Sequence, residues 1–211
     1  MIRAILFDLD GVLVDACEWH YQALNQALLA VCDVEINRQE HVSTFNGLPT
    51  KTKLNMLTEQ GRISRDSHNK VWSEKQRLTE EVINDNASTD ADKQNMHRRL
   101  GEQGYMLGCV TNSIKLTAHL MLKKTGQMKF LALTVTNEDV SVPKPSPEGY
   151  IKAMTAMGVS PSEVIIVEDS DKGFAAATAS GAYVLRVKNA THVNLDSILS
   201  KIQLVESEST S

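Results

Sequence analysis

Residues 2–11, IRAILFDLDG, open with a run of apolar side chains and close on two aspartates and a glycine. An apolar run without alternation is typical of a strand that is covered on both faces, as in a parallel sheet. Asp8 stands where this predicted strand ends, Asp10 follows shortly after it, and Gly11 permits a tight turn. Because ligands bind at the carboxyl ends of strands in open parallel sheets, we interpret the aspartate pair as part of a binding site.

Similar β-rich runs recur later in the chain and alternate with helical patterns. The runs predict strands at residues 105–111, 131–135, 164–167 and 182–187. Helices are expected between the later strands, around residues 114–126, 146–157 and 171–180. Strand–helix–strand repetition indicates an α/β domain with a doubly wound, Rossmann-like parallel sheet.

Residues 15–86 break this alternation and contain no convincing strand. They predict helices near residues 16–32, 50–60 and 66–84. We therefore expect a helical cap domain of residues 15–86, inserted into a discontinuous α/β core of residues 1–14 and 87–211. The polar tail, residues 206–211, is expected to fray.

Composition excludes several function classes. The 22 basic and 26 acidic residues give a formal net charge of −4, and only 5% of residues are aromatic, so we expect no nucleic-acid partner. The N-terminal apolar run is too short for a signal peptide, and we expect no membrane partner. Cys17, Cys32 and Cys109 lack metal-site spacing, which favours reduced thiols and a cytoplasmic location. We expect a monomer or a weak dimer.

The pair Asp8 and Asp10 suits a specific chemistry. Two close carboxylates serve a nucleophile beside an acid/base partner when a cation offsets their repulsion. A second acidic pair, Glu168-Asp169, follows the strand predicted at 164–167. Together the two pairs would make an all-oxygen Mg²⁺ site.

Two further segments at strand ends offer groups for an anion. Thr111, Asn112 and Ser113 supply hydroxyl and amide donors near a helix start, where phosphoryl groups bind, although the triplet also fits a simple helix cap. Lys144 lies between Pro143 and Pro145, which restrict the loop and would fix the cation.

The four segments together resemble the haloacid dehalogenase superfamily of phosphohydrolases. The resemblance covers nearly the whole chain and points to the branch with a helical cap after the first strand, which includes phosphoglycolate phosphatases and β-phosphoglucomutases. It depends on residues 7–15 (FDLDGVLVD), 111–113 (TNS), 144–148 (KPSPE) and 167–170 (VEDS) with Gly173.

The resemblance implies a role for each matching residue. Asp8 would attack phosphorus and form an aspartyl phosphate, while Asp10 would act as general acid and then as general base. Thr111 and Lys144 would bind phosphoryl oxygens, and Asn112 and Ser113 would contact the substrate. The implied Mg²⁺ site consists of Asp8, the backbone carbonyl of Asp10, Asp169, and Glu168 as a ligand or as a support for one.

The resemblance also nominates substrate-binding residues in the cap. Gly47, Thr50 and Lys51 match the substrate-specificity loop, and Glu18 and His20 match positions that face the cleft in sugar-phosphate-acting relatives. The alternative is that Lys51 lies on an exposed helix face and that His20 is structural.

The expected activity is hydrolysis of a small phosphorylated metabolite, with sugar phosphates favoured. A sugar phosphomutase is the first alternative, but mutases of this branch carry an arginine where this chain has Thr50, and a lysine at position 51 lacks the bidentate fork of arginine. The second alternative is a catalytically silent module that binds phosphate.

Overall fold

The computed structural model of the 211-residue chain describes residues 1–208. The chain divides into two compact units. The core unit consists of Met1–Asp15 and Ser88–Ser211, and the cap unit consists of Ala16–Ala87. Each of these boundaries lies one residue later in the chain than predicted.

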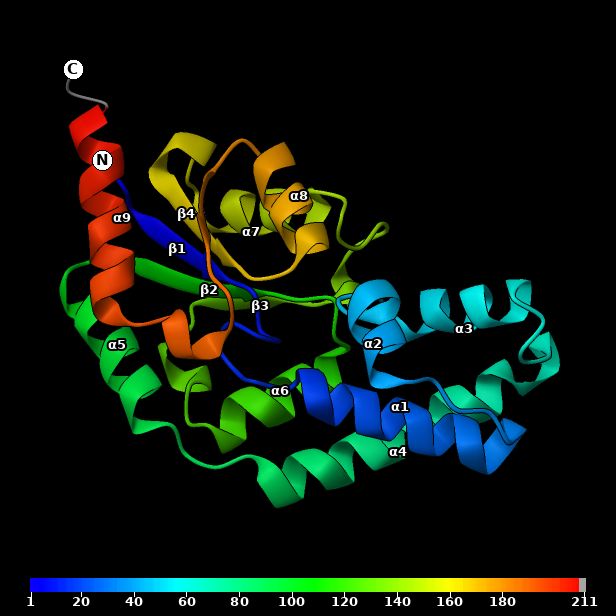
Figure 1. Ribbon diagram of the computed structural model, residues 1–211. Helices are drawn as coiled ribbons and strands as arrows, with labels where there is room; N and C mark the ends of the chain where they lie inside the picture. Colours follow the sequence, from blue (N-terminus) through cyan, green and yellow to red (C-terminus); the bar gives the residue numbers. More distant parts are fainter. Residues whose placement is uncertain (209–211) are drawn as a thin grey trace. The chain divides into compact units, whose positions relative to one another are not determined.

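A five-stranded parallel sheet forms the centre of the core unit (Figure 1). The strand order is β3-β2-β1-β4-β5, with β1 in the middle. In β1, Phe7 is in register with Cys109 of β2 and with Val167 of β4, so these three strands end at the same edge. The predicted doubly wound α/β fold is confirmed. The strands are β1 (Ala4–Phe7), β2 (Met106–Val110), β3 (Leu133–Val135), β4 (Val164–Glu168) and β5 (Tyr183–Arg186).

Helices pack on this sheet and bury its apolar faces. Every residue of β1 and β4 is buried, and Tyr150 and Ala153 of α7 belong to the hydrophobic cluster that covers them. The helices of the core unit are α5 (Ala91–Glu102), α6 (Lys115–Lys124), α7 (Glu148–Met157), α8 (Asp171–Ala179) and α9 (Leu195–Glu208).

Two features of the core differ from the expectation. Helix α5 has no counterpart in the prediction because its sequence is mostly polar, and Met96 and Leu100 are its only large apolar residues that are buried. Helix α9 was not predicted either, and it continues to Glu208, past residue 206 where fraying was expected. Ile198, Ile202 and Val205 recur at helical spacing and are buried, which holds this helix on the core. The rest of the predicted frayed tail, residues 209–211, lies outside the described residues.

The cap unit is built from helices around its own hydrophobic cluster. Leu24 and Leu28 of α1 pack there with Phe45, Leu57 of α3 and Val71 of α4. The predicted helices at 16–32, 50–60 and 66–84 correspond to α1 (Cys17–Cys32), α3 (Thr50–Glu59) and α4 (His68–Asn86). Shorter turns between them are α2 (Arg38–Glu40), the π-helical turn His41–Phe45 and the 3₁₀ turn Arg65–Ser67.

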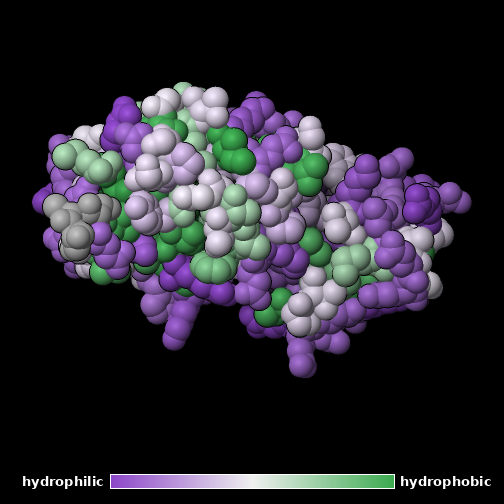
Figure 2. Space-filling view, turned by 90° about the horizontal axis from the view of Figure 1, so that it is seen from above, coloured by the Kyte–Doolittle hydropathy of each residue, from purple (hydrophilic) through white to green (hydrophobic). Residues whose placement is uncertain are grey.

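The surface is mostly hydrophilic on the face that Figure 2 shows, with hydrophobic side chains scattered over it. Among residues 1–208, the helices are too short or too polar to cross a lipid bilayer. Among the described residues, Cys17, Cys32 and Cys109 form no disulfide, and Cys109 is buried in β2.

Candidate active site

The candidate site lies at the carboxyl edge of the sheet. Asp8 follows β1, Thr111 follows β2, and Glu168 is the last residue of β4. Because β2, β1 and β4 are neighbours, residues far apart in sequence meet there. Lys144 reaches the same place from the loop that precedes α7.

Lys144 is the centre of the polar network. Its Nζ donates hydrogen bonds to Asp8 Oδ1 (2.8 Å), to Glu168 Oε1 (2.6 Å) and to the carbonyl oxygen of Val110 (2.8 Å). An ammonium group has three donors, so these three acceptors fix its position. Burial opposes the charged form, but Asp8 and Glu168 outweigh it and raise the pKa of Lys144.

Three carboxylates surround one point beside Lys144. Asp8, Glu168 and Asp169 each offer an oxygen atom within 4.8 Å of the others. Burial, together with repulsion from Glu168, raises the pKa of Asp8 well above its usual range and that of Asp169 to about 7. Within the described part of the chain, Glu168 Oε2 and Asp169 Oδ1 are buried without a hydrogen-bond partner. Buried carboxylate oxygens without partners are costly, and an oxygen-loving divalent cation would satisfy them, so these residues fit such an ion.

Asp10 lies on the tight loop after β1. Its Oδ2 accepts a hydrogen bond from the hydroxyl of Ser113 (2.8 Å), which orients the carboxylate. Gly11 has a φ of 83°, and a Cβ at this position would lie 2.1 Å from Asp169 Oδ2. The glycine is therefore required both for the turn and for the close approach of Asp169. The three-carboxylate group does not include the Asp10 side chain, and the backbone carbonyl of Asp10 stays a predicted ligand.

Asn112 holds the loop that carries Lys144. Its Nδ2 donates to the carbonyl oxygen of Lys144 (3.1 Å), and its Oδ1 accepts from the backbone N–H of Lys144 (2.9 Å). The structure shows the Asn112 amide anchoring this loop, and the expected contact of Asn112 with substrate stays a prediction. Thr111 is buried, and its Oγ1 accepts from the backbone N–H of Ser113 (3.0 Å).

The other predicted binding residues belong to the cap unit. Glu18 forms an ion pair with Arg38 (2.8 Å) on the surface of that unit. His20 lies on α1, and Gly47 has a φ of 72° in the turn before α3. The predicted loop residues Thr50 and Lys51 are the first two residues of α3, with Thr50 half-buried and Lys51 exposed.

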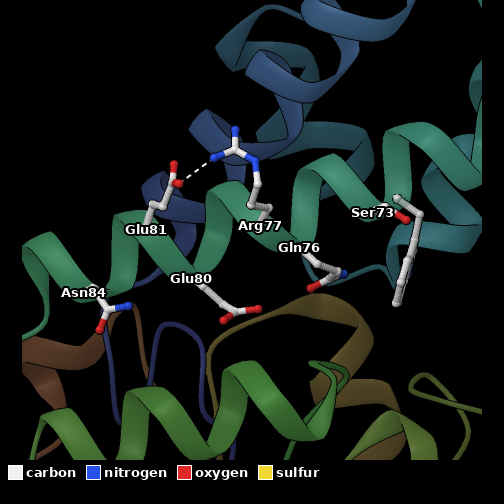
Figure 3. A pocket seen from close by; sticks show the side chains of 7 residues that line it. Ser73, Gln76, Arg77, Glu80, Glu81 and Asn84 are labelled. Carbon is white, nitrogen blue, oxygen red and sulfur yellow. Dashed lines mark hydrogen bonds and ion pairs between the residues drawn. The ribbon is translucent and has the colours of Figure 1, made fainter.

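A pocket of about 460 Å³ runs along one face of α4 (Figure 3). The residues that line it are all on this helix, and Figure 3 shows Arg77 paired with Glu81 along the helix. The carboxylate group described above is a separate feature of the core unit. The lining residues are Trp72, Ser73, Gln76, Arg77, Glu80, Glu81 and Asn84.

One polar contact at the site, between Tyr150 and Glu168, was not predicted from the sequence. Tyr150, in the first turn of α7, is fully buried, and its hydroxyl donates a hydrogen bond to Glu168 Oε1 (2.5 Å). In the sequence, Tyr150 reads only as an apolar position of a predicted helix, and its partner lies on another strand. Gly173 was noticed as part of a motif, but the sequence did not show that a Cβ there would lie 2.0 Å from Glu168 Oε2.

Comparisons with known proteins agree with this geometry. The family model for haloacid dehalogenase-like hydrolases matches residues 5–187. A pyrophosphatase PpaX of Bacillus velezensis is 29% identical over 177 residues, covering 80% of this chain and 75% of the relative. The structure of β-phosphoglucomutase from Clostridium difficile has a TM-score of 0.82 at 19% identity and covers 96% of this chain and 98% of that one. The structure of CbbY from Rhodobacter sphaeroides in complex with phosphate has a TM-score of 0.80 at 21% identity and covers 88% of this chain and 86% of that one. The chain belongs to the haloacid dehalogenase-like hydrolase family and is a hydrolase of the phosphatase type.

Proposed function

We propose that the protein is a Mg²⁺-dependent phosphatase that hydrolyses a small phosphorylated metabolite through an aspartyl phosphate on Asp8. The observation that carries the proposal is the arrangement at the carboxyl edge of the sheet. There, one buried ammonium group binds Asp8 and Glu168, and three carboxylates offer oxygens around a single point. With a divalent cation held among the carboxylates, the cation and the Lys144 ammonium would together offer positive charge where a phosphoryl group accumulates negative charge.

Asp8 is the proposed nucleophile. Burial and the neighbouring carboxylates raise its pKa and so favour the neutral form, whereas Lys144 acts in the opposite direction. Lys144 also holds Oδ1 through a hydrogen bond and thereby orients the carboxylate. Bound Mg²⁺, held by Asp8, Asp169, Glu168 and the backbone carbonyl of Asp10, would supply further positive charge against phosphoryl oxygens. Thr111 and Lys144 would bind those oxygens from the protein side.

Asp10 is the proposed proton-transfer group. It would protonate the leaving oxygen when Asp8 attacks, and would then take a proton from the water that hydrolyses the intermediate. The hydroxyl of Ser113 holds Asp10 Oδ2 and so limits its rotation during both steps. Hydrolysis of the aspartyl phosphate breaks its P–O bond to Asp8, regenerates the free enzyme and releases inorganic phosphate.

Sugar phosphates are the substrate class that we favour, with the cap residues Glu18, His20, Gly47, Thr50 and Lys51 as candidate contacts to the leaving group. CbbY from Rhodobacter sphaeroides has the same fold, and a mutant of that protein has been solved in complex with a xylulose bisphosphate. Pyrophosphate is a second candidate, because relatives at 25–29% identity are pyrophosphatases. We place the enzyme in the cytoplasm as a monomer or a weak dimer.

The test is a hydrolysis screen with and without Mg²⁺. Sugar phosphates, phosphoglycolate, nucleoside monophosphates and pyrophosphate are compared for the wild type and the Asp8→Asn variant. We expect phosphate release that needs both Mg²⁺ and Asp8, and equal release by the variant would refute the nucleophile assignment. Product analysis covers the alternatives. An isomerised sugar phosphate with little free phosphate would identify a mutase, and binding without turnover of any compound would identify a silent module.

A further inference from the structure

Tyr150 connects the two charged partners of the site without belonging to the residues assigned above. Its hydroxyl donates to Glu168 Oε1, and Lys144 Nζ lies 4.8 Å from the centre of its ring. An ammonium group over an aromatic ring is attracted to the ring face. One buried side chain therefore contacts both the carboxylate and the cation that orients Asp8.

The two oxygens of Glu168 have different surroundings. Oε1 accepts hydrogen bonds from Tyr150 (2.5 Å) and from Lys144 Nζ (2.6 Å). Oε2 is buried and has no hydrogen-bond partner among residues 1–208. The missing side chain of Gly173 leaves the space that the whole Glu168 carboxylate occupies, since a Cβ there would lie 2.0 Å from Oε2 and 2.1 Å from Oε1. The two donors thus engage one oxygen and leave the other for a ligand from outside the chain.

We propose that Tyr150 is a positioning residue, whose hydroxyl fixes the rotation of the Glu168 carboxylate so that Oε2 faces the cation site. Removal of the hydroxyl would leave Lys144 as the only donor to Oε1 in the described structure, and the carboxylate would turn more freely. Groups that orient metal ligands typically change metal affinity or activity by about 10–100-fold when they are removed. This inference rests on the proposed Mg²⁺-dependent function.

The test is direct titration of Mg²⁺ into the substrate-free protein by calorimetry, with Mn²⁺ binding followed by electron paramagnetic resonance as a second measurement. The variant Tyr150→Phe removes the hydroxyl and keeps the ring that packs in the core and lies near Lys144. We expect its dissociation constant for Mg²⁺ to rise about 10-fold, with a similar rise in the Mg²⁺ concentration needed for half-maximal activity. At saturating Mg²⁺, KM for the substrate should stay close to the wild-type value.

The matched control is Tyr183→Phe, which removes a hydroxyl from a half-buried tyrosine on β5 of the same unit. It should bind Mg²⁺ as the wild type does. If Tyr150→Phe is folded and binds Mg²⁺ with wild-type affinity, the positioning role is refuted while the proposed function stands. If the wild type itself binds neither ion, the metal site and the inference both fail.

Discussion

Replacement of Gly173 by alanine tests how tightly the Glu168 carboxylate is held. Gly173 lies in the first turn of α8 with an ordinary helical φ, so alanine is acceptable to the backbone. Its Cβ would nevertheless lie 2.0 Å from Glu168 Oε2 and 2.1 Å from the carboxyl carbon. A carboxylate at the end of a flexible side chain usually moves away from such a contact at little cost. Here the carboxylate is fully buried and bound to Lys144 and Tyr150, so movement must break or stretch those bonds.

The magnitude follows from those two bonds. A hydrogen bond to a charged group contributes about 1.5–3 kcal/mol, and the shift would remove about one such bond in total. Part of this loss is offset, because alanine in a helix stabilises the folded state by about 0.5–1 kcal/mol relative to glycine. We therefore expect Gly173→Ala to lower the free energy of unfolding by about 1–2 kcal/mol and to weaken Mg²⁺ binding, because Oε2 is displaced.

The assay is urea unfolding followed by circular dichroism, with Gly101→Ala as the control. Gly101 lies in α5 with no heavy atom within 4 Å of a built Cβ, so alanine should stabilise the protein by about 0.5–1 kcal/mol. The two variants make the same chemical change in two helices and should change stability in opposite directions. Equal stability of the two variants, with unchanged Mg²⁺ affinity in Gly173→Ala, would refute the claim that Glu168 is rigidly held.

Three other perturbations have definite expected outcomes. Lys144→Met leaves the carboxylates of Asp8 and Glu168 buried without their cation, so it should abolish hydrolysis and destabilise the protein by about 3–5 kcal/mol. In thermal unfolding, added Mg²⁺ should raise the Tm of this variant more than it raises the Tm of the wild type. Equal increases in Tm for the two proteins would contradict this reasoning. Burial lowers the pKa of His97 to about 4 from 6.5, so the unfolded chain takes up the proton first and stability should fall by up to about 3 kcal/mol as the pH drops from 6.5 to 4. Unfolding experiments across this pH range should show that the free energy of unfolding depends less steeply on pH in His97→Gln. An unchanged pH dependence would exclude His97 as its source. Asp90 caps α5 by accepting a hydrogen bond from the backbone N–H of Lys93 (2.9 Å). Asp90→Ala should therefore lower the free energy of unfolding in urea by about 1 kcal/mol. An unchanged free energy of unfolding would mean that water replaces the cap.

The fold was largely predictable because its signals are local. Continuous apolar runs such as residues 4–7 mark buried parallel strands, and each of the predicted strands overlaps one in the structure. Helix α5 was missed because most of its residues are polar, and it is held partly by contacts distant in sequence. Lys93, for example, donates to the carbonyl oxygen of Ala190 (2.6 Å), which no local pattern reveals.

The site was predictable only where residue type and strand end coincide. Asp8, Lys144 and Glu168 meet as expected because parallel topology brings strand ends together. The roles of Tyr150 and Asn112 were not predictable, since each depends on a partner 18 or more positions away in the sequence. A phenol hydroxyl or an amide carries no sequence signal for the atom that it will contact.

The most direct test of the central claim is to trap the phosphorylated enzyme. The protein is mixed with Mg²⁺ and the best substrate of the screen, quenched rapidly in acid, digested, and mapped by peptide mass spectrometry. We predict one phosphoryl group on Asp8, formed only with Mg²⁺ and lost as phosphate is released, and none on Asp10. Phosphoryl transfer to another residue, or full turnover by the Asp8→Asn variant, would contradict the account.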